Sequence, residues 1–289
     1  MPRTVWDDCW RNNHDSDGRV SVFQITIFLM YVIAGVLLAL TRLPRFSAHN
    51  KMMLGMATIL GLGGFVWHAW TLWMAIILPD GLSLSIGNTA SFIGLQIALV
   101  ALFGALQPTL RGLAGGLFIL AAAAAALTAW PTPTSAGDPI SWQIQLHVLI
   151  SLFAYGLLSV GAIVALFALV QEKRLQARKL SQVNQLFAPM ETTENLLFGI
   201  TASGFLVLLF AVFSGIAFVD DFFARHLVHK TALSLLALVL FGVLLAGRQF
   251  AGWRGKRAVY LYLWGFVILC LAYFGSRYVL EEVLGRSWS

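Results

Sequence analysis

Charged residues and cysteines are scarce in this sequence, and their scarcity excludes several classes of protein. Only 11% of the 289 residues are charged, and most of them fall between long apolar runs. The two cysteines, Cys9 and Cys270, lie in different surroundings and form neither a redox pair nor a metal knuckle. No phosphate-binding or base-reading motif is present, so the net charge of +6 needs no nucleic-acid partner. Thiol chemistry and nucleic-acid binding are therefore not expected.

Apolar residues make up 59% of the chain and gather in eight runs, each long enough to cross a bilayer. The runs cover about 20–41, 52–78, 88–106, 110–130, 142–171, 194–218, 228–247 and 257–280. They predict an all-α polytopic membrane protein, with a single domain of eight transmembrane helices over residues 20–289. Residues 1–19 are polar and are expected to form a disordered tail.

The basic residues set the predicted orientation in the membrane. Most of the 19 Lys and Arg residues lie in connections that share one side of the bilayer, and most of the 13 acidic residues lie on the other side. Basic loops stay on the cytoplasmic side, so both termini are predicted to face outward. The expected location is the bacterial inner membrane, with the lipid bilayer as the surrounding partner.

Four histidines lie within or beside the apolar runs, in the half of the bilayer that is predicted to be outer: His68, His147, His226 and His229. An imidazole inside a membrane is costly without a partner and is therefore a functional candidate. His147 and His229 are expected at similar depth, and His68 lies deeper. On the helical face of His68, Gly61 and Gly64 leave space for a flat group or for close helix approach. A simple hydrogen bond to a neighbouring helix is the alternative for His68.

Haem suits what these residues offer. Its iron takes one or two axial imidazoles, its ring needs apolar walls, and its propionates need cations. His147 and His229 are the predicted axial ligands, His68 is a second-site or alternate ligand, and His226 is a reserve. Arg277 can meet a propionate at the outer surface, although a snorkelling anchor explains the same residue.

Two late segments carry a family resemblance: PMETTENLLFGITASGFLVLLFAVFSG (189–215) and the stretch 229–276. The matching residues include Pro189, Glu194, Gly215 and the turn GWRGKR (252–257). On these residues the chain resembles the integral-membrane cytochrome c assembly family, in its HemX/YpjD-like branch, which is related to CcsA and CcmC. The resemblance implies a scaffold for haem b, with apocytochrome c or another cytochrome assembly protein as partner. It also implies that His147 is the first of two outer haem-ligating histidines.

One departure from the family keeps a second reading open. The tryptophan-rich outer loop of haem-delivering members is replaced here by AFVDDFFARHLVHK (217–230), which has no tryptophan. The alternative is a regulatory or scaffolding inner-membrane protein that has lost haem handling. A quinone-linked cytochrome fits less well, because the inner half of the helices has no histidine pairs. No catalytic residues are predicted, and an assembly factor is favoured over an enzyme.

Overall fold

The computed structural model describes residues 16–78, 81–82, 86–127, 141–176, 189–218 and 225–272. Within these ranges, seven helical segments are long and apolar enough to cross a membrane. The prediction of an all-α polytopic membrane protein is therefore confirmed. The elements in chain order are α2 (Ser16–Leu40), η1 (Pro44–His49), α3 (Asn50–Ile76), β1 (Ile77–Leu78), β2 (Gly81–Leu82), α4 (Ile86–Leu106), η2 (Pro108–Leu110), α5 (Arg111–Ala126), α6 (Trp142–Gln176), α7 (Met190–Phe218), α8 (Arg225–Ala251) and α9 (Lys256–Cys270).

The ends of the chain differ in part from the sequence prediction. Helix α2 already begins at Ser16, inside the predicted tail, because helical hydrogen bonding continues past the apolar run into polar residues. Residues 1–15 lie outside the described ranges. The eighth predicted span, 257–280, is described only through α9 and the two residues after it, and Arg277 lies beyond them. Between α3 and α4, the predicted turn contains a short antiparallel pair, Ile77↔Leu82 and Leu78↔Gly81.

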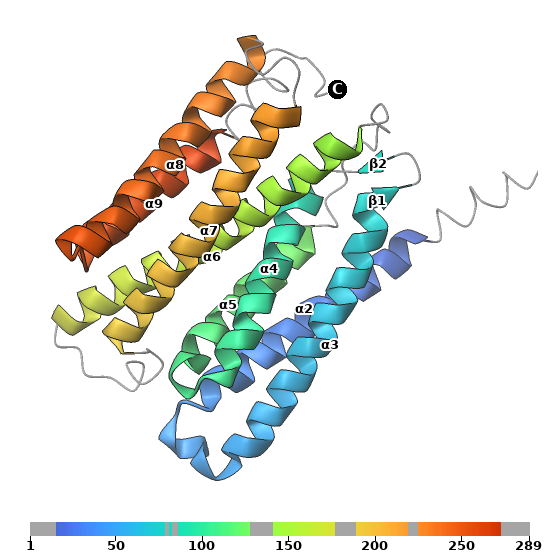
Figure 1. The fold of residues 1–289 in the computed structure, drawn as a ribbon. Coiled ribbons are helices and arrows are strands. Elements are labelled where there is room, and N and C mark those ends of the chain that lie inside the picture. The colour runs from blue at the N-terminus through green and yellow to red at the C-terminus, as the bar shows by residue number, and fades with distance from the viewer. Residues whose placement is uncertain are drawn as a thin grey trace, which may run out of the picture. The chain divides into compact units, whose positions relative to one another are not determined.

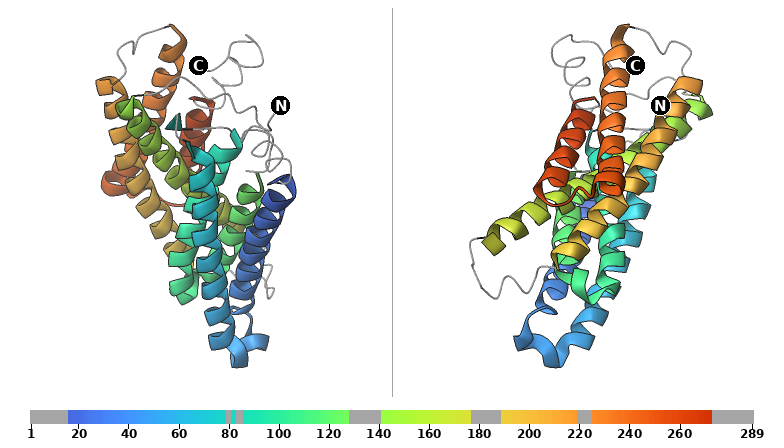
Figure 2. Two further views of the ribbon diagram at one scale, coloured as in Figure 1. Left: turned by 90° about the vertical axis from the view of Figure 1, so that its right-hand side faces the viewer. Right: turned by 60° about the vertical axis from the view of Figure 1, so that its left-hand side comes forward.

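The chain divides into two compact units, residues 1–76 with 84–134 and residues 77–83 with 135–289. The single membrane domain expected from the sequence thus contains two separate regions of packing. In the first unit, α2 and α3 run side by side and are joined at one end by η1 (Figure 2). Helix α5 packs on α2 and α4.

Glycines allow a close helix crossing in the first unit. A methyl group built on Gly115 of α5 would lie 2.6 Å from the carbonyl oxygen of Gly35 in α2, and the reverse distance is also 2.6 Å. Small residues at such positions let membrane helices approach closely enough for backbone contact. The α2–α5 crossing is therefore a backbone-to-backbone contact that a side chain at either position would block.

In the second unit, neighbouring helices contact each other in a cycle: α6 with α7, α7 with α8, α8 with α9, and α9 with α6. Helices α6 and α7 lie side by side along much of their length (Figure 1). Two tyrosines fasten α6 to α9 by donating to backbone carbonyls. Tyr155 bonds Leu269 O at 2.9 Å, and Tyr262 bonds Leu158 O at 2.7 Å.

Candidate functional site

His147 lies near the start of α6, where it meets the last turns of α7. Its Nδ1 is 2.9 Å from Ser214 Oγ, and Ser214 Oγ is 2.9 Å from the carbonyl oxygen of Ala211. A carbonyl oxygen can only accept, so the single hydroxyl proton of Ser214 serves Ala211. With its proton there, Ser214 Oγ presents lone pairs to Nδ1, which favours the Nδ1–H form of the imidazole. The backbone of Ala211 also hydrogen-bonds the imidazole. In the Nδ1–H form, Nε2 keeps its lone pair.

The ring of His147 rests against the backbone of α7 because residue 215 is glycine. A methyl group built on Gly215 would lie 3.0 Å from Cε1 of His147 and 3.6 Å from Nε2. Contacts this short would push the imidazole away from α7. Gly215 is one of the residues that carry the family resemblance. In the structure it forms the surface on which the imidazole rests.

The other two histidines of this unit lie at the same end, as the sequence predicts. Helix α7 ends at Phe218 and α8 begins at Arg225, so His226 and His229 fall in the first turns of α8. At the other end of these helices, Arg248 Nη2 donates to Asn195 Oδ1 at 3.4 Å, which fixes α7 and α8 as antiparallel neighbours. The side chains of His226 and His229 lie outside the described residues. Their part as iron ligands stays a prediction.

His68 belongs to the other unit and is a hydrogen-bonding bridge in this structure. It is 2% exposed, and both ring nitrogens have partners: Nδ1 is 3.3 Å from Tyr31 Oη, and Nε2 is 2.8 Å from Ser91 Oγ. These partners come from α2 and α4, so one imidazole on α3 joins three helices. Neither nitrogen is available to iron in this conformation. His68 instead forms hydrogen bonds to neighbouring helices, which is the alternative prediction for this residue.

The space that the sequence predicts beside His68 is filled by protein. A methyl group built on Gly61 would lie 2.7 Å from Cζ of Phe118, and one on Gly64 would lie 3.1 Å from a ring carbon of Tyr31. The two aromatic rings also contact each other, with centroids 5.7 Å apart. Of the two alternatives for these glycines, the structure shows close packing between helices: they make room for Phe118 and Tyr31.

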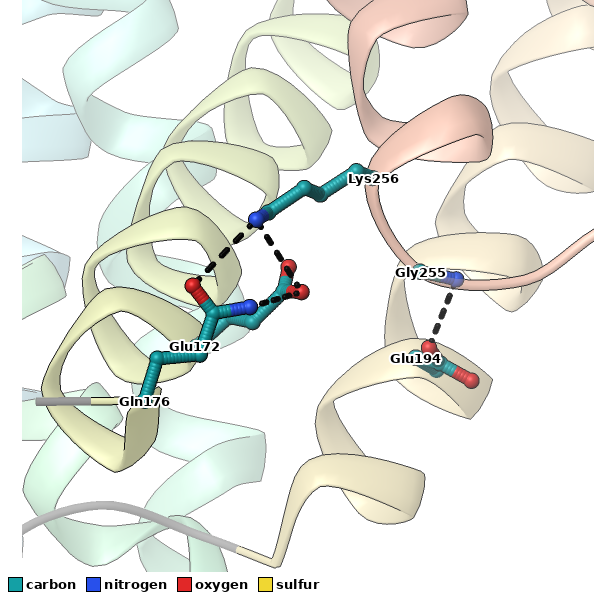
Figure 3. A network of polar contacts seen from close by, with 5 residues as sticks. All are labelled: Glu172, Gln176, Glu194, Gly255 and Lys256. Atoms are coloured by element: carbon teal, nitrogen blue, oxygen red, sulfur yellow. Dashed lines mark hydrogen bonds and ion pairs between the residues drawn. The ribbon is translucent and has the colours of Figure 1, made fainter. Parts of the chain in front are cut away.

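The opposite end of the second unit brings together the two segments that carry the family resemblance (Figure 3). The backbone N–H of Gly255 donates to Glu194 Oε1 at 2.9 Å. Gly252 and Gly255 have φ values of +62° and +63°, a conformation that glycine adopts without strain. Beside this contact, Lys256 Nζ lies 3.6 Å from Glu172 Oε1 and donates to Gln176 Oε1 at 3.4 Å. The start of α7 and the α8–α9 turn are thereby held together.

We expect Glu194→Ala to lower the free energy of unfolding by about 1 to 3 kcal/mol, because a carboxylate bond to a partly buried amide is lost. The matched control is Glu191→Ala, which removes an exposed carboxylate from the same turn of α7. Denaturant unfolding of the purified protein in detergent measures both variants. Equal losses in the two variants would contradict a specific role for the Glu194–Gly255 bond.

Comparison with known proteins supports both the membrane location and the family. The chain is similar to the protein named "Inner membrane protein YpjD" of Escherichia coli strain K12, with 32% identity over 271 residues, covering 91% of this chain and 99% of the relative. It is also similar to the protein named "Cytochrome c biogenesis protein CcsA" of Guillardia theta, with 22% identity over 162 residues, covering 50% of this chain and 54% of the relative. No solved structure matches the chain.

The apolar helices and the inner-membrane relative together make this a multi-pass inner-membrane protein. The model of the family described as "Cytochrome C assembly protein" matches residues 56–284, which include most of the first unit and nearly all of the second. Both the His147–Ser214 contact and the Glu194–Gly255 contact fall within the match. The chain therefore belongs to the cytochrome c assembly protein family.

Proposed function

We propose that the protein binds and handles haem b near the outer face of the inner membrane, with Nε2 of His147 as one axial ligand of the iron. Family membership supports a role in cytochrome c biogenesis. The haem ligands, the identity of the haem and its transfer to a partner are the parts that we propose. Apocytochrome c or another cytochrome assembly protein is the partner that suits this role.

The observation that carries the proposal is the bond between Nδ1 of His147 and Ser214, which in the Nδ1–H form leaves Nε2 with its lone pair. Metal-ligating histidines commonly donate their other ring N–H to an oxygen, which fixes the tautomer and the direction of the ring. His147 has this arrangement, with Nδ1 held by Ser214, and in the Nδ1–H form Nε2 keeps its lone pair. Bound haem would supply an iron whose axial positions take imidazole nitrogens.

The chemistry of the surrounding residues fits such a group. The face of α6 that carries His147 also carries Ile144, Ile150 and Ala154, which are apolar. His229 in the first turns of α8 is the proposed second ligand, with His226 as its reserve. We propose Arg277 as a cation for a propionate. His68 would become a ligand only after one of its two hydrogen bonds was broken.

A second function is favoured by a specific feature of the sequence. No tryptophan occurs in 217–230, where haem-delivering members of the resembled family carry a tryptophan-rich loop. A regulatory or scaffolding inner-membrane protein would need no such loop. This alternative predicts a colourless protein that still captures an assembly partner.

Absorption spectroscopy of the purified full-length protein, titrated with haem, separates the two functions. We expect a bis-imidazole haem spectrum for the wild type. His147→Ala and His229→Ala should each weaken binding at least as much as the roughly 10- to 100-fold typical of removing an outer-shell partner. The control is His49→Ala, which removes an exposed imidazole from η1. A wild type that takes up no haem, or a His147→Ala variant that matches His49→Ala, would contradict the proposal.

A further inference from the structure

The hydroxyl of Ser214 stands between the ring of His147 and the backbone of its own helix. We propose that Ser214 is a positioning residue: it holds His147 in the Nδ1–H tautomer, so that the lone pair of Nε2 is available to a metal. This inference rests on the proposed function of His147 as an iron ligand. Neither the sequence patterns nor the family resemblance indicates a role for Ser214.

The hydroxyl proton of Ser214 stays within α7. Hydroxyls inside helices commonly donate to a carbonyl three or four residues earlier. Several hydroxyls of this chain form such bonds. Ser159 donates to Tyr155 O at 2.7 Å, and Ser203 donates to Gly199 O at 3.0 Å. Ser214 behaves in the same way toward Ala211. Its proton is thus committed to the helix, and only oxygen lone pairs face the neighbouring imidazole.

His147 must therefore supply the proton of the hydrogen bond that it shares with Ser214. Nδ1 lies 2.9 Å from Ser214 Oγ, which is a normal hydrogen-bond distance. An oxygen whose proton points elsewhere can only accept, so Nδ1 carries the hydrogen. A neutral imidazole has one N–H, and Nε2 is then the acceptor nitrogen. The hydrogen bond from Ser214 to the carbonyl oxygen of Ala211 therefore determines which nitrogen of His147 can bind a metal.

His68, on α3 of the other unit, differs from His147 in how its ring nitrogens are bonded. Both nitrogens of His68 are bonded to side-chain oxygens, so neither is left for a ligand. His147 bonds Ser214 through Nδ1, which in the Nδ1–H form leaves the lone pair of Nε2, and its ring rests on Gly215. Residues 214 and 215 of α7 thus fix the tautomer and the place of the ring together.

Nitrogen-15 NMR of the haem-free, full-length protein in detergent tests the tautomer directly. At alkaline pH, where imidazole is neutral, protonated and unprotonated ring nitrogens have well-separated shifts, and the His147→Gln variant identifies the signals. We expect a protonated Nδ1 in the wild type, the same result in Ser214→Thr, and loss of the preference in Ser214→Ala.

Ser203→Ala removes a hydroxyl from the same helix and should leave the tautomer unchanged. A wild type protonated at Nε2 would overturn the proposal. So would a Ser214→Ala variant that keeps the Nδ1–H form, for example by donating to Ala211.

Haem titration supplies the second measurement. We expect Ser214→Ala to weaken haem binding by roughly 10- to 100-fold, as for other outer-shell partners of metal ligands, and Ser214→Thr to restore most of it. Equal affinities of Ser214→Ala and Ser203→Ala would overturn a positioning role. A wild type that binds no haem would instead overturn the proposed function. The NMR result, obtained without haem, still decides whether Ser214 holds the tautomer.

Discussion

Gly115→Ala is expected to destabilise the first unit by about 1 to 3 kcal/mol, although alanine is the better helix former. The added methyl group would lie 2.6 Å from the carbonyl oxygen of Gly35, closer than real methyl groups approach an oxygen. The obstructing atom belongs to the backbone of α2, so no side-chain rotation relieves the contact. The two helices must move apart, and the packing around the crossing is lost with them.

The next residue on α5 supplies the control. A methyl group built on Gly116 meets nothing within 4 Å, so Gly116→Ala should be neutral or should gain up to about 1 kcal/mol from helix propensity. Thermal or denaturant unfolding in detergent would then show a loss of stability for Gly115→Ala and none for Gly116→Ala. Changes of the same sign and size would contradict the close α2–α5 crossing.

Gly161→Ala is expected to have a comparable effect in the second unit, because the new methyl group would occupy the place of the Tyr262 hydroxyl. It would also lie 2.6 Å from Cζ of that ring and 3.2 Å from Ile200. Tyr262 is fully buried and donates to Leu158 O, so its displacement loses packing and a buried hydrogen bond together. We expect a loss of about 1 to 3 kcal/mol from overpacking, with about 1 kcal/mol more from the bond.

Two further variants separate these contributions. Tyr262→Phe keeps the ring and removes only the donor to Leu158, so it should show the smaller loss alone. Gly199→Ala adds a methyl group to α7 at a position with nothing within 4 Å and should not destabilise the protein. Unfolding of the four proteins under one detergent condition measures the series. A Gly161→Ala variant as stable as Gly199→Ala would show that Tyr262 can leave its position at no cost.

The sequence predicts the helices well because a span of a bilayer needs a long apolar segment, and charged residues mark where each segment ends. The apolar run that contains His147 became one continuous helix, α6. The roles of the small residues were harder to foresee. The sequence indicates that Gly61 and Gly64 leave space on one face of their helix. It does not indicate that Phe118 of α5 and Tyr31 of α2 fill that space.

The candidate site shows the same limit in another form. The sequence singles out His147 because an imidazole in a membrane requires a partner. The partner, Ser214, is 67 residues away, and one hydroxyl in an apolar helix carries no signal of its own. The available clue was the serine next to Gly215, whose missing side chain leaves room for an imidazole. Contacts between helices depend on rotation about each helix axis, which the weak amphipathicity of such apolar helices leaves undetermined.

The bridge through His68 ties three helices together through one buried side chain. A neutral imidazole has one N–H and one lone pair, so one of the two hydroxyls donates to His68 and the other accepts from it. A rotation of α3 that broke either bond would leave a buried ring nitrogen without its partner, which costs free energy. The side chain of His68 therefore opposes rotation of α3 relative to both α2 and α4.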